Sequence, residues 1–250
     1  MTETAKPGWI TADWPVPEHV HAGCSLRTGG HSQQPYESLN LGTHVGDDAA
    51  AVAQNRKSLF ERLGLPAEPV WLEQVHSTVV VNAAQQKAIT KADASYSHTV
   101  GVVCVVMTAD CLPVLFCDQQ GSKIAAAHAG WRGLADGVLE QTLQQAGFEP
   151  ANTLVWLGPG IGPDSYEVGD EVREAFLSQS VHAESAFRVS PNRRWLANMP
   201  ELARQRLNAA GVRQIYGGQH CTLKQAKEYF SYRRDGITGR MASLIWLTAQ

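Results

Sequence analysis

The stretch Val100–Cys117 reads VGVVCVVMTADCLPVLFC and sets the architecture of the chain. Val100–Met107 is an unbroken apolar run rich in β-branched residues, which is typical of a strand covered on both faces. Pro113–Cys117 indicates a second strand that pairs nearby, so we expect the centre of a sheet in this region. The break between the two runs, Thr108–Leu112, presents a thiol at Cys111.

Two histidines occupy similar positions at the ends of apolar runs. Ile124–Ala127 predicts a strand that is followed by His128, and Val70–Val75 predicts a strand that ends at His76. Strand ends are where a rigid scaffold usually presents its chemistry. Three strand ends at one edge of a sheet can converge although they lie far apart in the sequence. We therefore expect His76, Cys111 and His128 to form one site.

Turn and cap residues place the remaining elements. Asp47–Asp48 is an N-cap signal for a helix that runs to Leu63 and stops at Gly64, and a second helix is expected from Gly130–Gly133 to about Ala146. Further strands are expected at Ala22–Leu26, Thr78–Val81, Thr153–Leu157, Val212–Tyr216, Tyr229–Tyr232 and Ala242–Leu247, and further helices at Asp170–Ser178 and Met199–Ala210. The absence of repeats, low-complexity tracts and linkers favours a single domain over residues 1–250.

Composition excludes several classes of function. The 250 residues are 44% hydrophobic, which is enough for a substantial core, and the formal net charge is -3 without any basic block. A nucleic-acid or membrane-surface partner is therefore not expected. Met1–Pro7 leads into no apolar region, which argues against a signal peptide, and the longest apolar run is too short to span a bilayer. The odd count of five cysteines favours a reduced, cytoplasmic protein.

The cysteine and the two histidines allow three interpretations. Two imidazoles and one thiolate suit a borderline-soft ion such as zinc, which in catalytic sites has three protein ligands and one open position. Alternatively, Cys111 is a nucleophile with His128 as its base and Asp110 or a nearby amide as the orienting group. In the third interpretation all three side chains are packed or hydrogen-bonded structural residues. We assign the four other cysteines, Cys24, Cys104, Cys117 and Cys221, to packing.

Several polar residues are candidates for contacts with a substrate. Arginines beside glycine-containing turns can clamp a phosphate or a carboxylate, and amides next to apolar residues can donate to a base or a sugar. The arginines are Arg27, Arg132, Arg233, Arg234 and Arg240, and the amides are Asn40, Asn55 and Gln74. For each residue taken singly, a surface, turn or capping role is the alternative.

A set of motifs, distributed in order along nearly the whole chain, resembles one known family. The motifs are Arg27–Gly30, Ser38–Gly42, Asn55–Arg56, Gln74–His76, Thr108–Pro113, Ala127–Gly133, Tyr166–Gly169, Ser231–Arg234 and Gly239–Arg240. The chain resembles the YfiH-like family, whose members are described as laccase-domain proteins, polyphenol oxidases, purine nucleoside phosphorylases and peptidoglycan editing factors.

The resemblance implies a ligand set, a fold and an activity. The metal ligands of the family fall on His76, Cys111 and His128, which favours zinc, and copper bound there would be adventitious. The implied fold is an α+β sandwich with mixed sheets flanked by helices, related to deamidating bacterial toxins. The implied substrates are purine nucleosides with phosphate: phosphorolysis of adenosine, inosine and methylthioadenosine, together with hydrolytic deamination of adenosine.

The implied chemistry assigns roles to further residues. Deamination needs an acid to protonate the departing amine, for which Asp110 and Glu167 are candidates. Phosphorolysis needs anion clamps, for which Arg27, Arg56 and Arg233 are candidates. Alternatives are a peptidoglycan-precursor amidase that uses the same site, a copper-dependent polyphenol oxidase, which would need more histidine ligands, and a nucleoside or metal sensor without turnover.

Overall fold

The structure is a computed structural model that describes residues 8–249. Met1–Pro7, on which the expectation about a signal peptide partly rests, lies outside the described residues, as does Gln250. Within the described part of the chain, every helix is too short or too polar to cross a bilayer.

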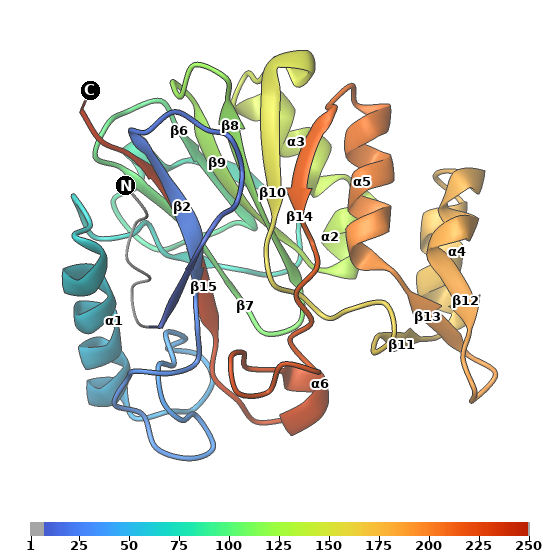
Figure 1. Cartoon of the computed structure of the whole chain (residues 1–250), viewed down its shortest axis with the longest axis horizontal. Coiled ribbons are helices and arrows are strands. Elements are labelled where there is room, and N and C mark those ends of the chain that lie inside the picture. Colours follow the sequence, from blue (N-terminus) through green and yellow to red (C-terminus); the bar gives the residue numbers. More distant parts are fainter. Residues whose placement is uncertain (1–7, 250) are drawn as a thin grey trace.

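Strands of two main sheets and two small ones alternate with helices along the chain (Figure 1). The strands are β1 (Trp9–Thr11), β2 (Val20–Ser25), β3 (Leu72–Glu73), β4 (Val80–Asn82), β5 (Thr90–Lys91), β6 (Ala94–Ser97), β7 (Val103–Thr108), β8 (Leu112–Asp118), β9 (Ile124–Ala129), β10 (Thr153–Leu157), β11 (Glu167–Val168), β12 (Phe187–Val189), β13 (Trp195–Ala197), β14 (Gln214–Gly217) and β15 (Met241–Leu247). The α-helices are α1 (Ala49–Leu63), α2 (Trp131–Asp136), α3 (Val138–Gln145), α4 (Asp170–Leu177), α5 (Met199–Ala209) and α6 (Tyr232–Asp235), and the 3-10 helices are η1 (Ala83–Gln85), η2 (Pro150–Asn152) and η3 (Val181–Ala186).

The two main sheets pack face to face. One is antiparallel with the order β1-β2-β15-β7, and the other is mixed with the order β14-β10-β8-β9-β6-β4. The apolar layer between them includes Cys24, Val106, Leu115, Ala126 and Ile245, all of which are almost completely buried. Burying this much apolar surface is the main favourable contribution to folding.

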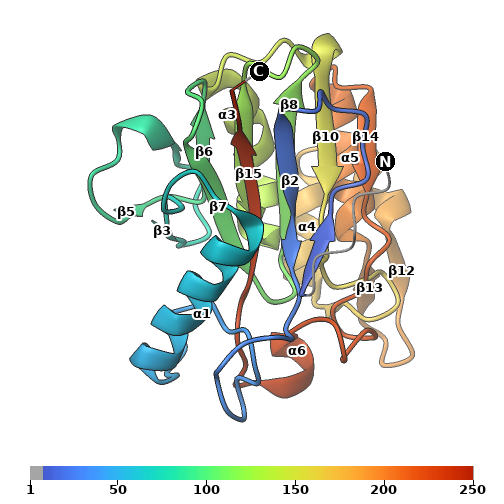
Figure 2. The same ribbon diagram turned by 60° about the vertical axis from the view of Figure 1, so that its left-hand side comes forward.

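Helices cover the outer faces of both sheets (Figures 1 and 2). Leu59 and Leu63 of α1 pack with Leu244 of β15 on the outer face of the four-stranded sheet. On the outer face of the six-stranded sheet, apolar residues of α2, α3, α4 and α5 join the core formed with β8, β9 and β10. The predicted α+β sandwich of mixed sheets flanked by helices is confirmed.

One prediction about the sheets is wrong. The strands β7 and β8 follow one another closely in sequence but belong to different sheets: β7 pairs with β15, and β8 lies between β9 and β10. The turn Ala109–Cys111 therefore crosses from one sheet to the other. Unbroken apolar strands fit both positions, because each sheet is covered on both faces. The segment Val70–Val75 is also mostly not a strand, since only Leu72–Glu73 forms β3.

Two further predictions about elements need correction. The helix expected from Gly130 to Ala146 is broken into α2 and α3 at Gly137, whose φ of 99° is a left-handed conformation suited to glycine. The strand expected at Tyr229–Tyr232 is instead the approach to helix α6, because the Ser231 side chain accepts a hydrogen bond from the Arg234 backbone N–H as an N-cap. By contrast, α1 has the predicted cap residues, Asp48 and Gly64.

Candidate functional site

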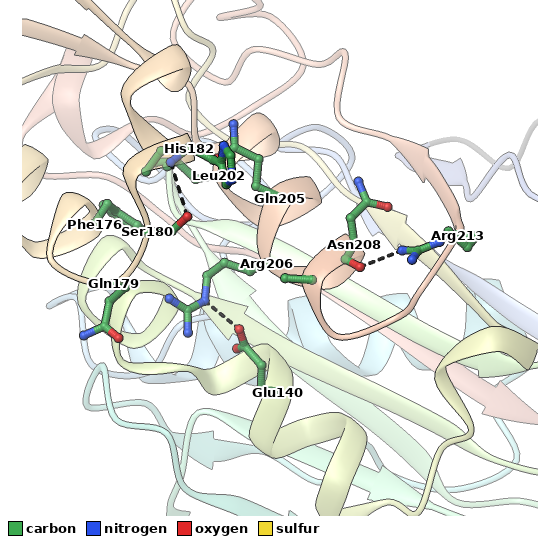
Figure 3. Close-up of a pocket in the computed structure, with 12 residues that line it drawn as sticks. Glu140, Phe176, Gln179, Ser180, His182, Leu202, Gln205, Arg206, Asn208 and Arg213 are labelled. Atoms are coloured by element: carbon green, nitrogen blue, oxygen red, sulfur yellow. Dashed lines mark hydrogen bonds and ion pairs between the residues drawn. The ribbon is translucent and has the colours of Figure 1, made fainter.

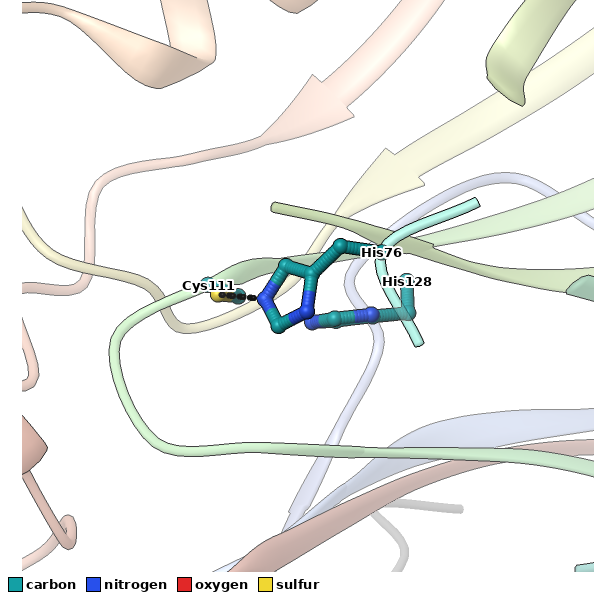
Figure 4. A group of neighbouring side chains, drawn as sticks. All are labelled: His76, Cys111 and His128. Atoms are coloured by element: carbon teal, nitrogen blue, oxygen red, sulfur yellow. Dashed lines mark hydrogen bonds between the residues drawn. The ribbon is translucent and has the colours of Figure 1, made fainter. Parts of the chain in front are cut away.

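The side chains of His76, Cys111 and His128 meet at one end of the six-stranded sheet (Figure 4). His128 lies in β9, Cys111 directly precedes β8, and His76 lies between β3 and β4. The Cys111 Sγ and His76 Nε2 atoms are 3.8 Å apart, and one ligand atom from each of the three residues lies within 4.8 Å of the others. Among the described residues, this is the one group of three or more histidine, cysteine or acidic side chains that could hold a metal ion.

One buried carboxylate positions both histidines. Asp93, which directly precedes β6, has no exposed surface, and one of its oxygens lies 2.8 Å from His128 Nδ1. The same carboxylate accepts hydrogen bonds from the backbone N–H groups of Val75, His76 and Ser77, and from the Ser77 hydroxyl. Although burial alone would raise it, hydrogen bonds from His128 and Ser77 lower the pKa of Asp93 to about 2. The bond to Nδ1 leaves His128 Nε2 directed toward the group, as is usual for a metal-ligating histidine.

The backbone around the group is locally constrained. His76 has a φ of 61° and Asp110 a φ of 89°, both of which are sparsely populated by residues other than glycine. Such conformations persist only where the surrounding contacts hold them, and Asp93 supplies those contacts for His76. Gly130 faces the group closely, because a Cβ there would lie 2.5 Å from His76 Cδ2 and 3.4 Å from Cys111 Sγ. Any larger residue at position 130 would displace these ligand side chains.

Electrostatic interactions within the His76–Cys111–His128 group favour a negatively charged Cys111 beside a positively charged His128. Burial raises the pKa of the Cys111 thiol, but the His128 and His76 side chains outweigh burial and lower this pKa to about 6. Burial lowers the pKa of His128, while the Cys111 thiolate and Asp93 raise it to about 9. The group therefore stabilises a thiolate beside a positive charge. A cation can replace that proton, because metal ligation requires deprotonated ligands.

The three side chains open into a cavity of ≈ 440 Å³, a volume within the range of small-molecule sites. Its other lining residues are His44, Gln74, Met107, Thr108, Ala109, Tyr232 and Arg240. None of the described residues that line it is acidic. The walls come from both sheets: His128 belongs to the six-stranded sheet, whereas Thr108 ends β7 and Arg240 directly precedes β15 of the four-stranded sheet.

Of the residues that the sequence offered as candidates for substrate contact, Gln74 and Arg240 line this cavity. The Gln74 side-chain amide pairs with both the N–H and the C=O of Met107, at 2.7 and 2.8 Å. Asn40 is buried, and its side chain donates to Gly42 O and Asp47 and accepts from the N–H groups of Gly42 and Arg240. Asn40 thus holds the backbone of Arg240.

The three predicted anion clamps make contacts within the protein. The Arg27 guanidinium donates to the carbonyl oxygens of Glu37 and Ala226. Arg56 donates to Leu41 O and stacks on Trp71, with its guanidinium carbon 3.7 Å from the ring centroid. Arg233 donates through its guanidinium to Glu167 O. None of the three lines the cavity.

The predicted acid Asp110 is also engaged. Its carboxylate accepts a hydrogen bond from the Thr222 hydroxyl and another from the Arg233 N–H, each at 2.6 Å. These bonds fix the turn that presents Cys111. The other candidate acid, Glu167, hydrogen-bonds Asn192 and is not among the cavity-lining residues.

Sequence reasoning missed Asp93 and His44, and it did not single out Arg240 among the turn arginines. Asp93 follows Lys91 and Ala92 as a lone acidic residue before a short strand, which in sequence is indistinguishable from a turn aspartate. The Gly239–Arg240 pair carried a signal, since a glycine allows an arginine to approach a ligand closely. The packing assignment holds for the buried Cys24, Cys104 and Cys117, whereas Cys221 is half-buried and accepts a hydrogen bond from Gly162 N–H.

A second cavity of ≈ 720 Å³ lies between α3, α4, η3 and α5 (Figure 3). Phe176 and Leu202 contribute apolar surface, and an ion pair joins Arg206 Nε to Glu140 at 2.7 Å. None of the predicted site residues lines it. The smaller cavity is the candidate site because the thiolate and imidazole chemistry is concentrated there.

Comparisons with known proteins agree with the geometry. The family described as multi-copper polyphenol oxidoreductase laccase matches residues 21–248. The chain is 54% identical over 239 residues to "Purine nucleoside phosphorylase YfiH" of Escherichia coli strain K12, covering 95% of this chain and 98% of that protein. It is 52% identical over 240 residues to a purine nucleoside phosphorylase of Pseudomonas aeruginosa, covering 96% of this chain and 98% of the relative.

Solved structures give the same result. A crystal structure of a Neisseria meningitidis protein superposes with a TM-score of 0.94 at 51% identity, covering 97% of this chain and all of that one. The structure of YlmD from Geobacillus stearothermophilus has a TM-score of 0.88 at 31% identity, covering 99% of this chain and 98% of that one. Because similarity in sequence and structure extends over nearly its whole length, this chain belongs to the YfiH family of laccase-like domains.

Proposed function

We propose that this protein is a zinc-dependent purine nucleoside phosphorylase. The observation that carries the proposal is the His76–Cys111–His128 group in an open cavity, in a chain that is 54% identical to a protein named purine nucleoside phosphorylase. Two nitrogen ligands and one sulfur ligand suit zinc and leave one position open. The supporting hydrogen bond from His128 to Asp93 and the close approach allowed by Gly130 fit a metal centre as well.

The reaction joins phosphate to the sugar and releases the base. An oxygen of hydrogen phosphate bonds to the anomeric carbon of the ribose while the bond from that carbon to the purine nitrogen breaks. The electron pair of the broken bond goes to the purine, which takes up the proton that hydrogen phosphate carried. The products are a free purine and ribose 1-phosphate.

The residues of the cavity suit these requirements. A zinc ion held by His76, Cys111 and His128 would supply a Lewis acid that stabilises negative charge and makes water more acidic. Tyr232 lines the cavity and is 60% exposed, so its ring offers a face on which a planar base stacks. None of the described lining residues carries a carboxylate, which keeps the cavity favourable for phosphate.

The same cavity suits the deamination of adenosine, which forms part of the proposal. In that reaction water adds to the ring carbon that bears the amino group, and ammonia leaves. A proton must reach the departing amine from a group at the cavity. Because the Asp110 carboxylate already accepts two short hydrogen bonds, we assign it to positioning Cys111 and look for the proton donor among the cavity-lining side chains.

The test compares Cys111→Ala with the matched control Cys221→Ser. Cys221 is also partly exposed but lies outside the cavity. Purified proteins are assayed for bound metal, for conversion of inosine and phosphate to hypoxanthine and ribose 1-phosphate, and for conversion of adenosine to inosine. We expect Cys111→Ala to lose the metal and both activities, and Cys221→Ser to keep all three.

Two results would contradict the proposal. One is full phosphorolysis by a metal-free Cys111→Ala protein, and the other is a zinc-loaded wild type that cleaves no purine nucleoside. The metal analysis also addresses copper, because a thiolate with two imidazoles is a donor set that electron-transfer copper sites share. The proposal of a zinc enzyme would give way to that of a copper oxidase if the protein oxidised phenols with one added copper per chain and showed no phosphorolysis with any metal.

A further inference from the structure

Arg240, which directly precedes β15 of the four-stranded sheet, lines the candidate cavity. Its backbone is held on both sides: its N–H donates to Asn40 Oδ1 at 2.9 Å, and its carbonyl accepts from Leu41 N–H at 3.2 Å. The next residue, Met241, begins β15 and pairs with Thr108 of β7. The start of the Arg240 side chain is therefore fixed at the point where the two sheets meet.

Arg240 forms no ion pair with a carboxylate of residues 8–249. Its Nη1 donates to the carbonyl oxygens of Thr238 and Gly239, whereas Nε and Nη2 have no hydrogen-bond acceptor within residues 8–249. No carboxylate of the described chain lines the cavity either. Burial lowers the pKa of Arg240, and the negative charges of Cys111 and Asp110 offset this only in part. The guanidinium therefore gains from pairing with an anion from solution.

Two neighbouring side chains on the same cavity lack partners as well. The Thr108 side chain is 2% exposed, and its hydroxyl has no hydrogen-bond partner among the described residues. The His44 side chain is exposed, and its ring has no hydrogen bond within that part of the chain either. Burial, followed by the positive charges of Arg240 and Arg56, lowers the pKa of His44, so this imidazole is neutral and can donate one N–H at neutral pH.

We propose that Arg240, His44 and Thr108 form an oxyanion subsite that binds inorganic phosphate, in the same cavity as the His76–Cys111–His128 group. A guanidinium offers two parallel N–H donors that match two oxygens of a phosphate. In Arg240 these donors are Nε and Nη2, which have no acceptor among the described residues. This inference rests on the proposed function in one respect, which is that the bound phosphate is the one that attacks the nucleoside.

The proposed subsite also agrees with the way in which residues of the two sheets contribute to the cavity. The metal group and Asp93 are carried by the six-stranded sheet, while Arg240 and Thr108 belong to the four-stranded sheet. A nucleoside bound in the cavity would meet both the His76–Cys111–His128 group and the attacking phosphate. Arg27, Arg56 and Arg233, which the sequence favoured as anion clamps, have guanidinium contacts elsewhere.

The experiment measures binding of inorganic phosphate by calorimetry in wild type, Arg240→Gln, Arg240→Lys and the matched control Arg213→Gln. Arg213 donates to the carbonyl of Asn208 and lies outside this cavity. Binding is measured both in zinc-loaded protein and in the Cys111→Ala background, so that phosphate bound by a metal is separated from phosphate bound by Arg240. Steady-state assays then give the KM for phosphate and the KM for inosine.

We expect Arg240→Gln to weaken phosphate binding by about ten- to a hundredfold, as loss of hydrogen bonds to a charged group does. The KM for phosphate should rise by the same factor, while the KM for inosine and the zinc content stay within about twofold of wild type. The phosphate affinity of Arg240→Lys should lie between those of wild type and Arg240→Gln, because lysine keeps the positive charge but lacks the two parallel N–H donors of a guanidinium. Thr108→Val, which keeps the side-chain shape, provides a second test if Arg240→Gln does not fold.

Several outcomes would overturn the subsite. These are phosphate binding by Arg240→Gln that equals wild type, a Thr108→Val protein with unchanged phosphate affinity, and an Arg240-dependent site that takes acetate but not phosphate. The last result would assign the site to the carboxylate of a different substrate. If wild type binds phosphate through Arg240 but cleaves no nucleoside, the subsite stands and the proposed function fails.

Discussion

Asp93 joins two of the three candidate metal ligands through one carboxylate. It holds the His128 ring by a side-chain hydrogen bond and the strained backbone of His76 by an amide hydrogen bond. At the scale of single residues, the position of the ligands therefore depends on a side chain that lines no part of the cavity.

We expect Asp93→Asn to weaken zinc affinity by about ten- to a hundredfold, because an amide cannot satisfy His128 and three backbone N–H groups in the same way. The matched control is Asp118→Asn. Asp118 is also buried and accepts bonds from Ser122 and Lys123 in a turn, but it lies at the end of β8 away from Cys111 and outside the cavity. Zinc affinity is measured by competition with a chelator, and the prediction is wrong if both variants lose affinity equally.

The pH dependence of thiol reactivity provides a second test at this scale. The pKa of Cys111 is lowered to about 6, so in metal-stripped protein its reactive thiolate is present above that pH and is lost as the pH falls through it. A free cysteine changes near pH 8.5. We expect iodoacetamide to label Cys111 with a midpoint near 6, measured by peptide mass spectrometry, and added zinc to suppress the labelling. A midpoint like that of free glutathione would contradict the lowered pKa.

The sequence predicted that His76, Cys111 and His128 would come together, but it did not predict the residue that supports them. Cys111, His76 and His128 stand out because each follows an apolar run, and the family resemblance assigned all three to one site. Asp93 has no comparable signal, because the atoms that it binds belong to backbone groups whose direction only the folded chain defines. For the same reason, the sequence did not distinguish Arg240, whose Nε and Nη2 have no acceptor among the described residues, from Arg27, whose Nε, Nη1 and Nη2 all donate to carbonyl oxygens.

At the scale of elements, α1 is the part that local sequence defines best. The Asp48 side chain accepts a hydrogen bond from Ala51 N–H at 2.9 Å, and Gly64 ends the helix with a φ of 63°. We expect Asp48→Ala to lower the free energy of unfolding by about 1 kcal/mol and Asp48→Asn by less than half of that, because asparagine also caps well. Urea denaturation measures both, and equal losses in the two variants would argue against the cap.

Elements whose ends depend on distant contacts were predicted less well. The break at Gly137 separates α2 from α3, although the surrounding residues suit one continuous helix. Near Gly137, the Arg206 guanidinium of α5 donates to Ala135 O and pairs with Glu140. Arg206 is 71 positions after Ala135 and 66 after Glu140 in the sequence, so no local pattern shows these contacts.

At the scale of the whole molecule, the layer between the two sheets dominates stability. Leu115 of β8 lies in this layer with no exposed surface. We expect Leu115→Ala to lower the free energy of unfolding by about 3 kcal/mol, since truncating a buried leucine costs transfer energy and leaves a cavity. The control Val181→Ala, at a side chain 76% exposed, should change it by less than about 0.5 kcal/mol. A loss below about 1 kcal/mol for Leu115→Ala in urea denaturation would contradict this account.

The apolar character of this layer also explains why the sequence did not predict which strands pair with one another. Apolar runs predicted the strands, but an apolar strand fits either sheet, so the assignment of β7 and β8 to different sheets depends on which partner each strand finds. The single domain over residues 1–250 stays a prediction from the lack of linkers in the sequence.

The segment Ala109–Cys111 passes from one sheet to the other beside the candidate cavity. The packed layer between the sheets therefore sets the distance between the cavity residues that each sheet carries. The sheets lie roughly 10 Å apart, as stacked sheets do, and the side chains between them hold that gap. If one sheet carries the metal group and the other carries the phosphate subsite, the length of the gap sets how far the attacking oxygen stands from the sugar. A substitution deep in the layer could then slow turnover while each half of the cavity still bound its own ligand at full strength.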